Sequence, residues 1–432
     1  MRVAFIVGTF PVLSETFIIN QIVGAIERGH EVDIYADEIG DTDKVHPDVI
    51  KYKLLEKTYY LPKIPSNLVL RLVKGIELLG VNLFKDPLSV ARSLNVLKYG
   101  KQAMSLWLLY TVIPNLKKSY DIIHCQFGTQ SFRGIAFKTT NSPEAKIVTT
   151  FRGHDISRFV REKGDRIYDE VFKLGDFFLS NCDFFRRRVI QLGCDGNKIV
   201  VVRSGLDCNK FTFQPRQFPA DGKVKIVTTG RLVEKKGIEY SIRAVAKLAK
   251  AYPNLEYNII GNGELKESFQ RLIQELGVSH IVNLLGWKNE REIIEILDNS
   301  HIFIAPSVTA ADGNQDAPIN VLKEAMAMGL PVISTYHGGI PELVEDGISG
   351  FLVPERDADA LAEKLGQLLE HPENWTKMGT AGRAYVETHY NLHKLNDDLV
   401  KIYQKILTKN ASNNQVVIPE NSQPRKFKPR RI

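Results

Sequence analysis

The feature that most constrains the fold is a repeated alternation of short apolar runs, glycine-containing loops and amphipathic helical stretches. Residues 3–7 form a continuous apolar run, residues 15–28 have helical spacing with Ser14 as a candidate cap, and residues 31–36 return as a second run. Continuous apolar runs are typical of parallel strands that are covered on both faces. Strands that alternate with helices predict an α/β fold built on a doubly wound parallel sheet.

The same alternation recurs in two blocks along the chain. Further strands are predicted at residues 121–125, 146–150, 176–180, 199–202, 225–228, 255–260, 282–284, 302–304 and 332–334. Residues 211–222 lack the pattern and contain two prolines and a glycine, which indicates a linker. A chain of 432 residues is also too long for one ordinary core. We therefore expect two such domains, over residues 1–210 and 223–390.

Composition narrows the compartment and excludes several classes of protein. The four cysteines form no C-x-x-C pair, so neither a zinc site nor a disulfide framework is expected, which fits a reducing cytoplasm. The apolar run at residues 3–7 is too short for a signal peptide, and no stretch approaches the roughly 18 apolar residues that span a bilayer. No nucleic-acid-binding motif accompanies the formal charge of +7. We expect a cytoplasmic protein that does not bind nucleic acid.

Residues 313–329 are typical of a polar loop that leads into a helix, and they contain two carboxylates that packing does not explain. Pro318 suits the first helical position, and Gly329 is placed to end the helix. Asp316 lies before this helix and Glu324 in its second turn. Helix N-termini attract phosphate, and carboxylates accept hydrogen bonds from hydroxyls. The stretch suits a ligand that is part phosphate and part polyol, such as a nucleotide sugar. An Asp favoured by the helix dipole and a solvent-facing Glu would give the same pattern.

A basic loop bounded by glycines follows the strand at residues 225–228. Arg231 and Lys236 lie in this loop, next to glycines that allow a ligand to approach the backbone closely. This arrangement favours a pyrophosphate clamp over solvated surface charges. The dinucleotide fingerprint is absent, because residues 8–14 contain one glycine and Lys266 stands where the third glycine of a later loop would fall. A nicotinamide-dependent dehydrogenase is therefore disfavoured.

The second half of the chain resembles retaining glycosyltransferase family 4, whose members have the GT-B fold of two Rossmann-like domains that face each other across a cleft. The resemblance covers roughly residues 200–390. Its motifs are GRL at 230–232, KG at 236–237, IIGNG at 259–263, PS at 306–307, EAMAMGLPV at 324–332, GGIPE at 338–342 and GFLV at 350–353. The opening FP at 10–11 and SETFI at 14–18 resemble the exopolysaccharide subgroup, close to the transferases of colanic acid and amylovoran assembly. The resemblance implies transfer of a sugar from a UDP- or GDP-sugar to a growing saccharide.

The resemblance also implies roles for individual residues of the second domain. The paired acidic motif of the family falls on Asp316, in place of the usual Glu, and on Glu324. The first acid would face the donor sugar, and the second would hold the nucleotide ribose. The basic pair of the family falls on Arg231 and Lys236, which would face the diphosphate. The implied donor-binding residues are Gly230, Arg231, Lys236, Gly261, Asn262, Asp316, Ala317, Pro318, Ile319 and Glu324.

The first domain would supply the acceptor side. The His-Gly-x-Asp motif of the family falls on residues 152–155, where Arg152 occupies the usual His position and His154 follows, so that either could take that role. The implied acceptor-side residues are Gly8, Thr9, Phe10, Ser14, Glu15, Arg152 and His154. The implied catalytic residues are Asp316, Glu324, Arg231, Lys236 and His154.

Charge accounts for the implied reaction without a cofactor. Cleavage of a sugar–phosphate bond leaves negative charge on the diphosphate, which Arg231 and Lys236 can stabilise. The family needs no metal, and we expect none here. Two acidic pairs imitate a metal-binding motif, but residues 41–43 are typical of an exposed loop and residues 357–359 of a helix start.

Two alternatives of other classes stay open on the residues alone. A glycoside hydrolase also uses two carboxylates, about 5 to 9.5 Å apart. The eight residues from Asp316 to Glu324 would span roughly 12 Å as a continuous helix, unless the loop folds back. A non-catalytic carbohydrate- or lipid-binding module would recognise similar ligands without turnover.

Residues 51–110 combine basic and apolar side chains. From Lys51 to Lys101 there are ten basic and three acidic residues, a net charge of +7, interleaved with Leu, Val, Ile, Tyr and Phe. This mixture suits an anionic interface. We expect an insertion that contacts the inner face of the plasma membrane as a peripheral protein and admits a lipid-linked acceptor. A helical insertion with a solvated basic edge is the alternative.

The C-terminal part divides in two. Residues 391–408 have helical spacing, and the resemblance implies that this helix crosses back onto the first domain. Residues 409–432 are rich in Asn, Gln, Pro, Lys and Arg, which predicts a disordered basic tail. The sequence leaves open the donor sugar, the base, the acceptor and the oligomeric state.

Overall fold

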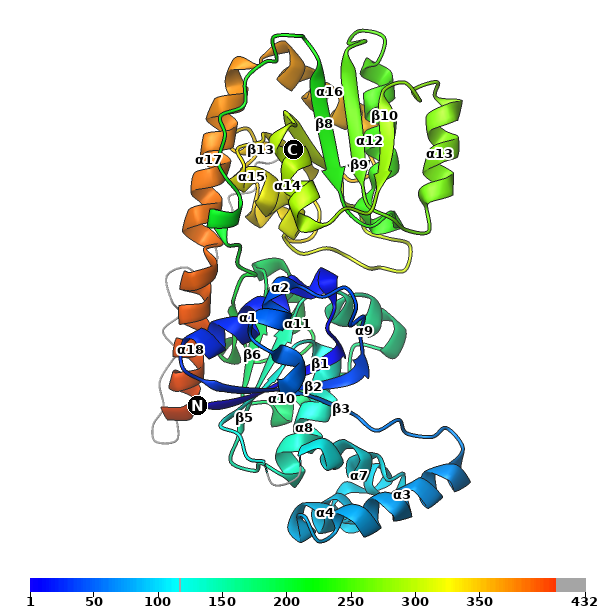
Figure 1. Ribbon diagram of the computed structural model, residues 1–432, viewed down its shortest axis with the longest axis vertical. Coiled ribbons are helices and arrows are strands. Elements are labelled where there is room, and N and C mark those ends of the chain that lie inside the picture. Colours follow the sequence, from blue (N-terminus) through cyan, green and yellow to red (C-terminus); the bar gives the residue numbers. More distant parts are fainter. Residues whose placement is uncertain (116–117, 409–432) are drawn as a thin grey trace.

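The computed structural model describes residues 1–115 and 118–408. Two α/β domains lie one above the other, and two helices near the C-terminus run along one side of both (Figure 1). The predicted tail, residues 409–432, lies outside the described residues. The predicted fold class is confirmed, because each domain is built on its own parallel sheet with helices between the strands.

The first sheet has seven parallel strands in the order β3-β2-β1-β4-β5-β6-β7. The strands are β1 (Arg2–Phe10), β2 (Glu31–Ile39), β3 (Thr58–Tyr60), β4 (Ile122–Cys125), β5 (Lys146–Phe151), β6 (Phe177–Ser180) and β7 (Ile199–Val201). The helices are α1 (Thr16–Glu27), α2 (Pro47–Lys51), α3 (Leu68–Asn82), α4 (Pro87–Ser93), α5 (Val96–Tyr99), α6 (Lys101–Met104), α7 (Trp107–Val112), α8 (Ser131–Thr140), α9 (Arg158–Lys163), α10 (Asp169–Leu174) and α11 (Asp183–Gln191).

The second sheet has six parallel strands in the order β10-β9-β8-β11-β12-β13. The strands are β8 (Val224–Thr229), β9 (Leu255–Ile260), β10 (Val282–Gly286), β11 (Ile302–Ala305), β12 (Val332–Thr335) and β13 (Gly350–Val353). The helices are α12 (Ile238–Leu248), α13 (Lys266–Glu275), α14 (Glu290–Asp298), α15 (Asn320–Ala327), α16 (Ala358–Glu370), α17 (Glu373–His389) and α18 (Leu392–Thr408).

Strand order reverses at the first strand of each sheet. In the first sheet β1 lies between β2 and β4, and in the second β8 lies between β9 and β11. Ligands of such sheets bind beyond the carboxyl ends of the strands at this switch point. The continuous apolar runs explain these positions, since Val3, Phe5 and Val7 of β1 are fully buried.

The loop predicted after the first strand begins later than expected. β1 continues to Phe10 because β2 is equally long, and Thr9 and Phe10 pair with residues 38 and 39 of that strand. Gly8, Thr9 and Phe10 are therefore strand residues and not loop residues. The predicted cap is also wrong, because Ser14 lies in a 3-10 turn (Leu13–Glu15) and no side chain caps α1.

The helix of residues 313–329 also starts later than predicted. α15 begins at Asn320 with Ile319 at its N-cap, so Pro318 precedes the helix. Tertiary contacts hold this approach in an extended form. The Gly339 N–H donates to the Asp316 carbonyl at 3.4 Å, and a Cβ on Gly339 would lie 2.5 Å from Pro318 Cδ. The tertiary contact decides where the helix starts, and the proline does not.

The predicted insertion, residues 51–110, contains part of the sheet itself. Thr58–Tyr60 is β3, which pairs with β2 at the sheet edge, and the helices that leave the sheet begin at Leu68.

At the other end of the chain, α18 lies against the first domain. It packs on α1, and Asp397 forms an ion pair of 2.7 Å with Arg28 at the end of α1. Tyr403 of α18 contacts His124 of β4 at 2.6 Å. Within the described ranges, none of the helices has the length and apolar character needed to cross a membrane.

Candidate active site

The candidate site lies where loops at the carboxyl ends of strands from the two sheets meet. In the second domain, the loop 230–237 follows β8, and the loop 306–319 follows the neighbouring strand β11. The first domain approaches the second of these loops directly. The Arg161 guanidinium donates to the Ala311 carbonyl at 2.9 Å, and a Cβ on Gly153 would lie 3.4 Å from the Gln315 carbonyl oxygen. The residues predicted from both domains are therefore brought to one cleft.

Asp316 is the centre of a buried ion cluster. Its carboxylate oxygens lie 2.9 Å from Lys235 Nζ and 2.7 Å from Lys236 Nζ, and the Ser307 hydroxyl donates to it at 3.2 Å. The side chain is nearly buried, which alone would raise the pKa of Asp316. The ammonium groups of Lys236 and Lys235 outweigh this effect and hold that pKa well below its usual range. Burial lowers the pKa of Lys236, and Asp316 opposes that shift.

This cluster changes the predicted arrangement of the site. Sequence reasoning assigned Asp316 to the sugar and Lys236 to the diphosphate as separate groups, whereas the structure pairs them with each other. Lys235 was missed, although the signal was present, because it adjoins Lys236 in the same loop. Spacing along the chain could not tell which of two adjacent lysines turns toward the cleft. Both do.

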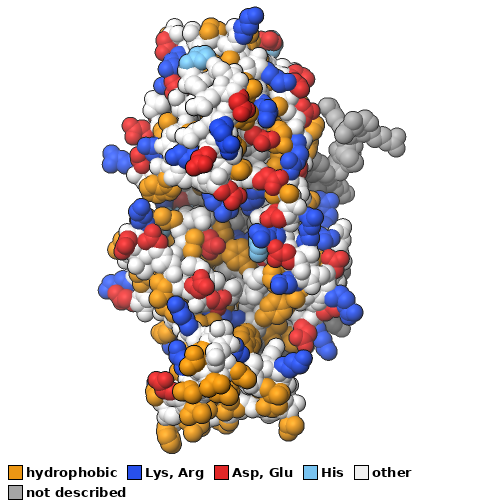
Figure 2. Space-filling view, turned by 90° about the vertical axis from the view of Figure 1, so that its right-hand side faces the viewer, with side chains coloured by type: hydrophobic (Ala, Val, Ile, Leu, Met, Phe, Trp, Pro, Cys, Tyr) orange, Lys and Arg blue, Asp and Glu red, His pale blue; other side chains and the backbone are white. Residues whose placement is uncertain are grey.

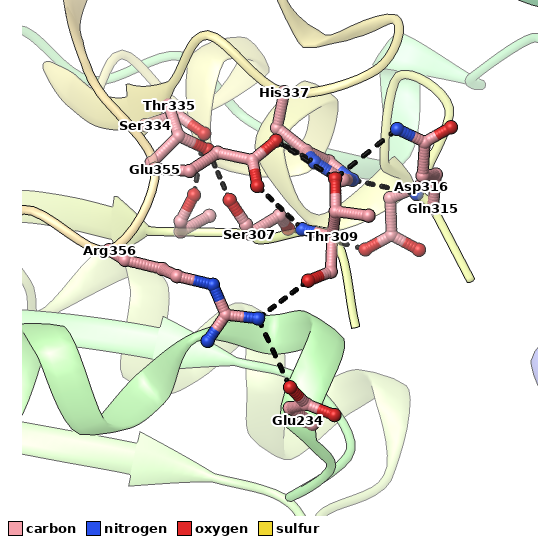
Figure 3. Close-up of polar contacts among 11 residues, drawn as sticks. Glu234, Ser307, Thr309, Gln315, Asp316, Ser334, Thr335, His337, Glu355 and Arg356 are labelled. Atoms are coloured by element: carbon pink, nitrogen blue, oxygen red, sulfur yellow. Dashed lines mark hydrogen bonds and ion pairs between the residues drawn. The ribbon is translucent and has the colours of Figure 1, made fainter. Parts of the chain in front are cut away.

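A buried histidine supports Asp316 from behind (Figure 3). His337 follows β12 and is fully buried. Its Nε2 accepts a hydrogen bond from the Asp316 backbone N–H at 2.9 Å, so the ring proton is on Nδ1, which lies 2.6 Å from a carboxylate oxygen of Glu355. Glu355 also accepts from the Thr309 backbone N–H at 2.7 Å. His337 and Glu355 thus fix both ends of the loop segment 309–316.

Sequence reasoning missed both of these positioning residues. The available signal for His337 was its place just before the paired glycines at 338–339, beyond the carboxyl end of a strand. For Glu355 the chain offers no comparable signal, since it reaches Thr309 and His337 only through the fold.

The glycine motifs of the second domain permit close backbone contact. Gly261 has φ +139°, and a Cβ there would lie 1.9 Å from the Gly230 carbonyl oxygen. A Cβ on Gly263 would lie 2.4 Å from the Leu232 carbonyl oxygen. Asn262 and Arg231 are exposed at the edge formed by these loops. Close packing of the two loops therefore requires glycine at both positions and presents Arg231 outward.

Glu324 lies apart from the Asp316 cluster, in the second turn of α15. It lines an interdomain cavity of about 210 Å³, together with Asn320 of the same helix, Glu290 of α14, and Thr16 and Asn20 of α1. Burial raises the pKa of Glu324 to about 7, against the opposing charge of Lys323. Asp316 is paired with two lysines, whereas Glu324 faces this cavity, so the two carboxylates make separate sets of contacts.

The neighbouring Lys323 is buried beneath the crossing between the domains. Its Nζ donates to the Ser204 carbonyl at 2.7 Å and lies 5.0 Å from the centre of the Tyr390 ring. Burial lowers the pKa of Lys323 to about 7, and Glu324 opposes this shift. Burial thus disfavours the charged form of each side chain, and the opposite charge of the neighbour partly offsets that effect.

Of the two candidates for the family His, Arg152 is held inside the first domain. It donates to the side chains of Gln21 at 3.1 Å and Gln126 at 2.7 Å, and its guanidinium lies 4.4 Å from the centre of the Phe17 ring. Burial lowers the pKa of Arg152 to about 10. His154 is exposed in the turn His154–Ile156, next to the contact between Gly153 and Gln315. The geometry favours His154 as the group that can reach a ligand.

The other predicted residues fall around the same cleft. Glu15 is half-buried, and burial raises its pKa while Arg152 opposes the shift. Ser14 is exposed beside it. Ala317 packs against the apolar cluster of the first domain that includes Phe151, and Ile319 packs against the core of the second. The segment 315–319 therefore packs against both domains and closes the cleft at this point.

The two acidic pairs that imitate a metal motif have structural roles. The Asp357 carboxylate caps α16 by accepting from the Ala360 N–H at 2.8 Å. The Asp41 carboxylate closes a turn by accepting from the backbone N–H groups of Asp43 and Lys44.

Comparison with known proteins agrees with this geometry. The family model of glycosyl transferases group 1 matches residues 209–385, and that of Glycosyltransferase Family 4 matches residues 14–210. The chain is 33% identical to the putative colanic acid biosynthesis glycosyltransferase WcaL of Escherichia coli strain K12. It is 34% identical to the amylovoran biosynthesis glycosyltransferase AmsK of Erwinia amylovora, and both matches cover 94% of this chain and all of the relative.

The fold is shared with solved structures of low sequence identity. The crystal structure of Anabaena Alr3699/HepE in complex with UDP superposes with a TM-score of 0.68 at 16% identity, over 94% of this chain and all of that one. The hydrolase and the non-catalytic binding module, which the residues alone left open, do not agree with these matches. The chain therefore belongs to glycosyltransferase family 4, in the group that contains the colanic acid and amylovoran transferases.

Proposed function

We propose that this glycosyltransferase moves a sugar from a UDP- or GDP-sugar to a growing, lipid-linked saccharide in exopolysaccharide, capsule or lipopolysaccharide biosynthesis, with retention of configuration. The observation that carries the proposal is the cluster of Lys235, Lys236 and Asp316 at the switch point of the second sheet. Nucleotide ligands of this sheet type bind at that point.

The lysines are suited to the diphosphate of the donor. Two ammonium groups share one carboxylate, with Arg231 exposed beside them, so the local charge is positive. An incoming diphosphate competes with Asp316 for Lys235 and Lys236. The Asp316 carboxylate then becomes available to accept hydrogen bonds from the sugar hydroxyls.

The same groups serve the departure of the leaving group. When the sugar–phosphate bond breaks, negative charge grows on the diphosphate, and cations already in place stabilise it without reorganisation. We infer that transfer needs no metal, because Arg231, Lys235 and Lys236 supply the positive charge. Retention is carried over from family 4.

The cavity beside Glu324 is suited to the nucleoside. The Glu324 carboxyl group faces a cavity of about 210 Å³ that polar side chains of both domains help to line. A ribose there would donate its hydroxyl hydrogen bonds to Glu324. The saccharide acceptor would bind from the first domain, near Glu15 and His154.

A lipid-linked acceptor would place the enzyme at the inner face of the plasma membrane as a peripheral protein. The names of the relatives above refer to colanic acid and amylovoran biosynthesis, which supports a saccharide acceptor for this chain. We expect no nucleic acid partner.

A thermal-shift panel of nucleoside diphosphates and nucleotide sugars tests the donor. A ligand at 100 times its dissociation constant stabilises the protein by about 2.7 kcal/mol. We expect UDP or GDP to raise the unfolding temperature in the presence of EDTA, and the matching sugar nucleotide to be consumed with a lipid-linked acceptor. Failure of every nucleotide to stabilise the protein would refute the donor assignment.

A further inference from the structure

The helical insertion after β3 exposes an exceptional amount of apolar surface. Among the described residues, 13 of the 23 exposed large hydrophobic side chains lie between residues 68 and 104. We call these 13 side chains the apolar cap, and it includes Leu68, Val73, Ile76, Phe84, Leu88 and Leu97. Phe84 is 87% exposed. Figure 2 shows hydrophobic side chains gathered at the end of the molecule that lies farthest from the second domain.

Helix α3 turns its apolar face outward. Val69, Val73 and Ile76 follow one another at helical spacing, and each is more than 60% exposed. The side toward the protein is narrow, since only Gly75 and Asn82 of this helix are buried. A Cβ on Gly75 would lie 2.6 Å from a methyl carbon of Leu106. Surface helices of soluble domains normally bury their apolar stripe against the core. The exposed stripe of α3 is therefore suited to contact an apolar environment outside the protein.

The segment that carries the apolar cap also carries exposed basic side chains. Residues 61–104 contain seven lysines or arginines and two acidic residues. Lys63, Lys85, Arg92, Lys98 and Lys101 are exposed. The surface is therefore apolar and cationic together, which is the composition of segments that lie in an anionic lipid interface.

The charge decides between a bilayer and a second copy of the chain. A two-fold dimer through the apolar cap would bring the same positive patch against itself. A bilayer with anionic headgroups accommodates both the apolar side chains and the lysines. Since no described helix is long and apolar enough to cross a membrane, the contact is an interfacial one.

We propose that the apolar cap inserts into the headgroup and upper acyl region of an anionic bilayer and anchors the first domain there. The inference deepens the proposed function, on which it rests for its purpose, because it brings the acceptor side of the cleft to lipid-linked saccharides. The inference also shortens the segment, residues 51–110, that the sequence analysis predicted to contact the membrane. Lys51 lies at the interdomain cavity, and β3 follows at the sheet edge, so residues 51–60 are not part of this surface.

A site-specific fluorophore tests the insertion directly. The four native cysteines are buried, so a single cysteine introduced as Ile76→Cys can be labelled selectively with an environment-sensitive dye. Ile348→Cys, on an exposed loop of the second domain, is the matched control. With phosphatidylcholine vesicles containing phosphatidylglycerol, we expect a blue shift and protection from an aqueous quencher at position 76 and neither at 348. Equal behaviour at both positions would overturn the proposal.

Vesicle flotation separates the apolar from the electrostatic contribution. Replacing Val69, Val73 and Ile76 with Ser should lower binding by about tenfold or more, even at high salt, because each loses burial of its side chain. Ile348→Ser should leave binding unchanged. Lys98→Glu with Lys101→Glu should lower binding to anionic vesicles only.

Two further measurements separate this inference from the proposed function. Transfer to a water-soluble acceptor should be unchanged in the serine variant, whereas transfer to vesicle-bound acceptor should fall. Vesicle binding without any transfer would refute the function and leave the anchor standing. Wild-type protein that ignores vesicles, or a lipid-free dimer that the serine substitutions dissociate, would refute the anchor.

Discussion

Replacing His337 with Phe tests whether the buried histidine positions the donor-facing carboxylate. Phenylalanine keeps the ring volume but removes both hydrogen bonds of the imidazole. The Asp316 N–H then loses its acceptor in a buried site, and a Glu355 oxygen loses its donor. An orphaned buried polar group costs about 1 to 3 kcal/mol. Glu355 is partly exposed and keeps the Thr309 N–H, so most of the cost falls on Asp316.

The expected destabilisation is therefore about 2 to 3 kcal/mol. For a domain of roughly 150 to 250 residues, each kcal/mol lowers the unfolding temperature by about 2 to 4 °C. We expect differential scanning calorimetry to record a fall of about 4 to 12 °C. Because residues 309–316 lose their support, Asp316 should shift, and kcat should fall by on the order of tenfold to a hundredfold.

A matched variant distinguishes positioning from general stability. The side-chain carbonyl of His337→Gln can still accept from the Asp316 N–H, so this variant should recover part of both losses. A Phe variant with wild-type unfolding temperature and kcat would refute the reasoning. A Phe variant that loses stability but retains kcat would leave His337 a structural role only.

Three further predictions concern the cleft. Lys235→Ala and Lys236→Ala should each lower kcat by on the order of a hundredfold in an assay of nucleoside-diphosphate release, and Arg231→Ala somewhat less, while the exposed Lys247→Ala stays at the wild-type rate. Glu324→Gln should weaken nucleotide binding in calorimetric titration by about tenfold or more, since a hydrogen bond to a charged acceptor contributes about 1.5 to 3 kcal/mol. The same variant should unfold at a higher temperature than wild type at pH 8 but not near pH 4. The folded-state pKa of Glu324, about 7, lies above the ordinary value of 4.5. Wild type therefore loses stability as the pH rises from the ordinary pKa through the folded-state pKa, and the variant does not. Glu342→Ala should increase the radius of gyration in small-angle scattering. The Glu342 carboxylate accepts hydrogen bonds from the backbone N–H groups of Asp183 and Phe184 across the cleft, at 2.8 and 2.7 Å, and such a cap contributes about 1 kcal/mol. Unchanged scattering and activity would show that the contact does not hold the domains together.

The sequence predicted the inner strands of both sheets because their signal is local, but it did not predict two edge strands, β3 and β13. The apolar run at residues 3–7 is continuous, and residues 225–228 contain Ile226 and Val227, and both segments are inner strands of parallel sheets. The errors came where a distant partner decides. Strand β1 reaches Phe10 because β2 is long enough to pair with it, and α15 waits until Asn320 because Gly339 holds the segment before it.

The site was predicted in its charges but not in its connections. Asp316, Glu324, Arg231 and Lys236 were found from residue type and from loop position. Their pairing was not, because the ion pair joins residues 80 apart in sequence. The outward face of α3 was equally hidden, since helical periodicity reports that a stripe is apolar and not which way it points.

The crossing between the domains limits how they can move. The chain passes from one domain to the other twice, and the two passages are joined side by side by the bridge between Leu206 and Asn391, with backbone hydrogen bonds of 2.7 and 3.1 Å. Because both covalent connections lie at one edge, the easiest motion is a hinge rotation of one domain relative to the other about an axis at that edge. The Arg161 guanidinium and the Ala311 carbonyl, which form a hydrogen bond of 2.9 Å between the domains, would separate as such a rotation opens the cleft. Rotation about this axis would therefore bring the donor side and the acceptor side of the cleft together or apart.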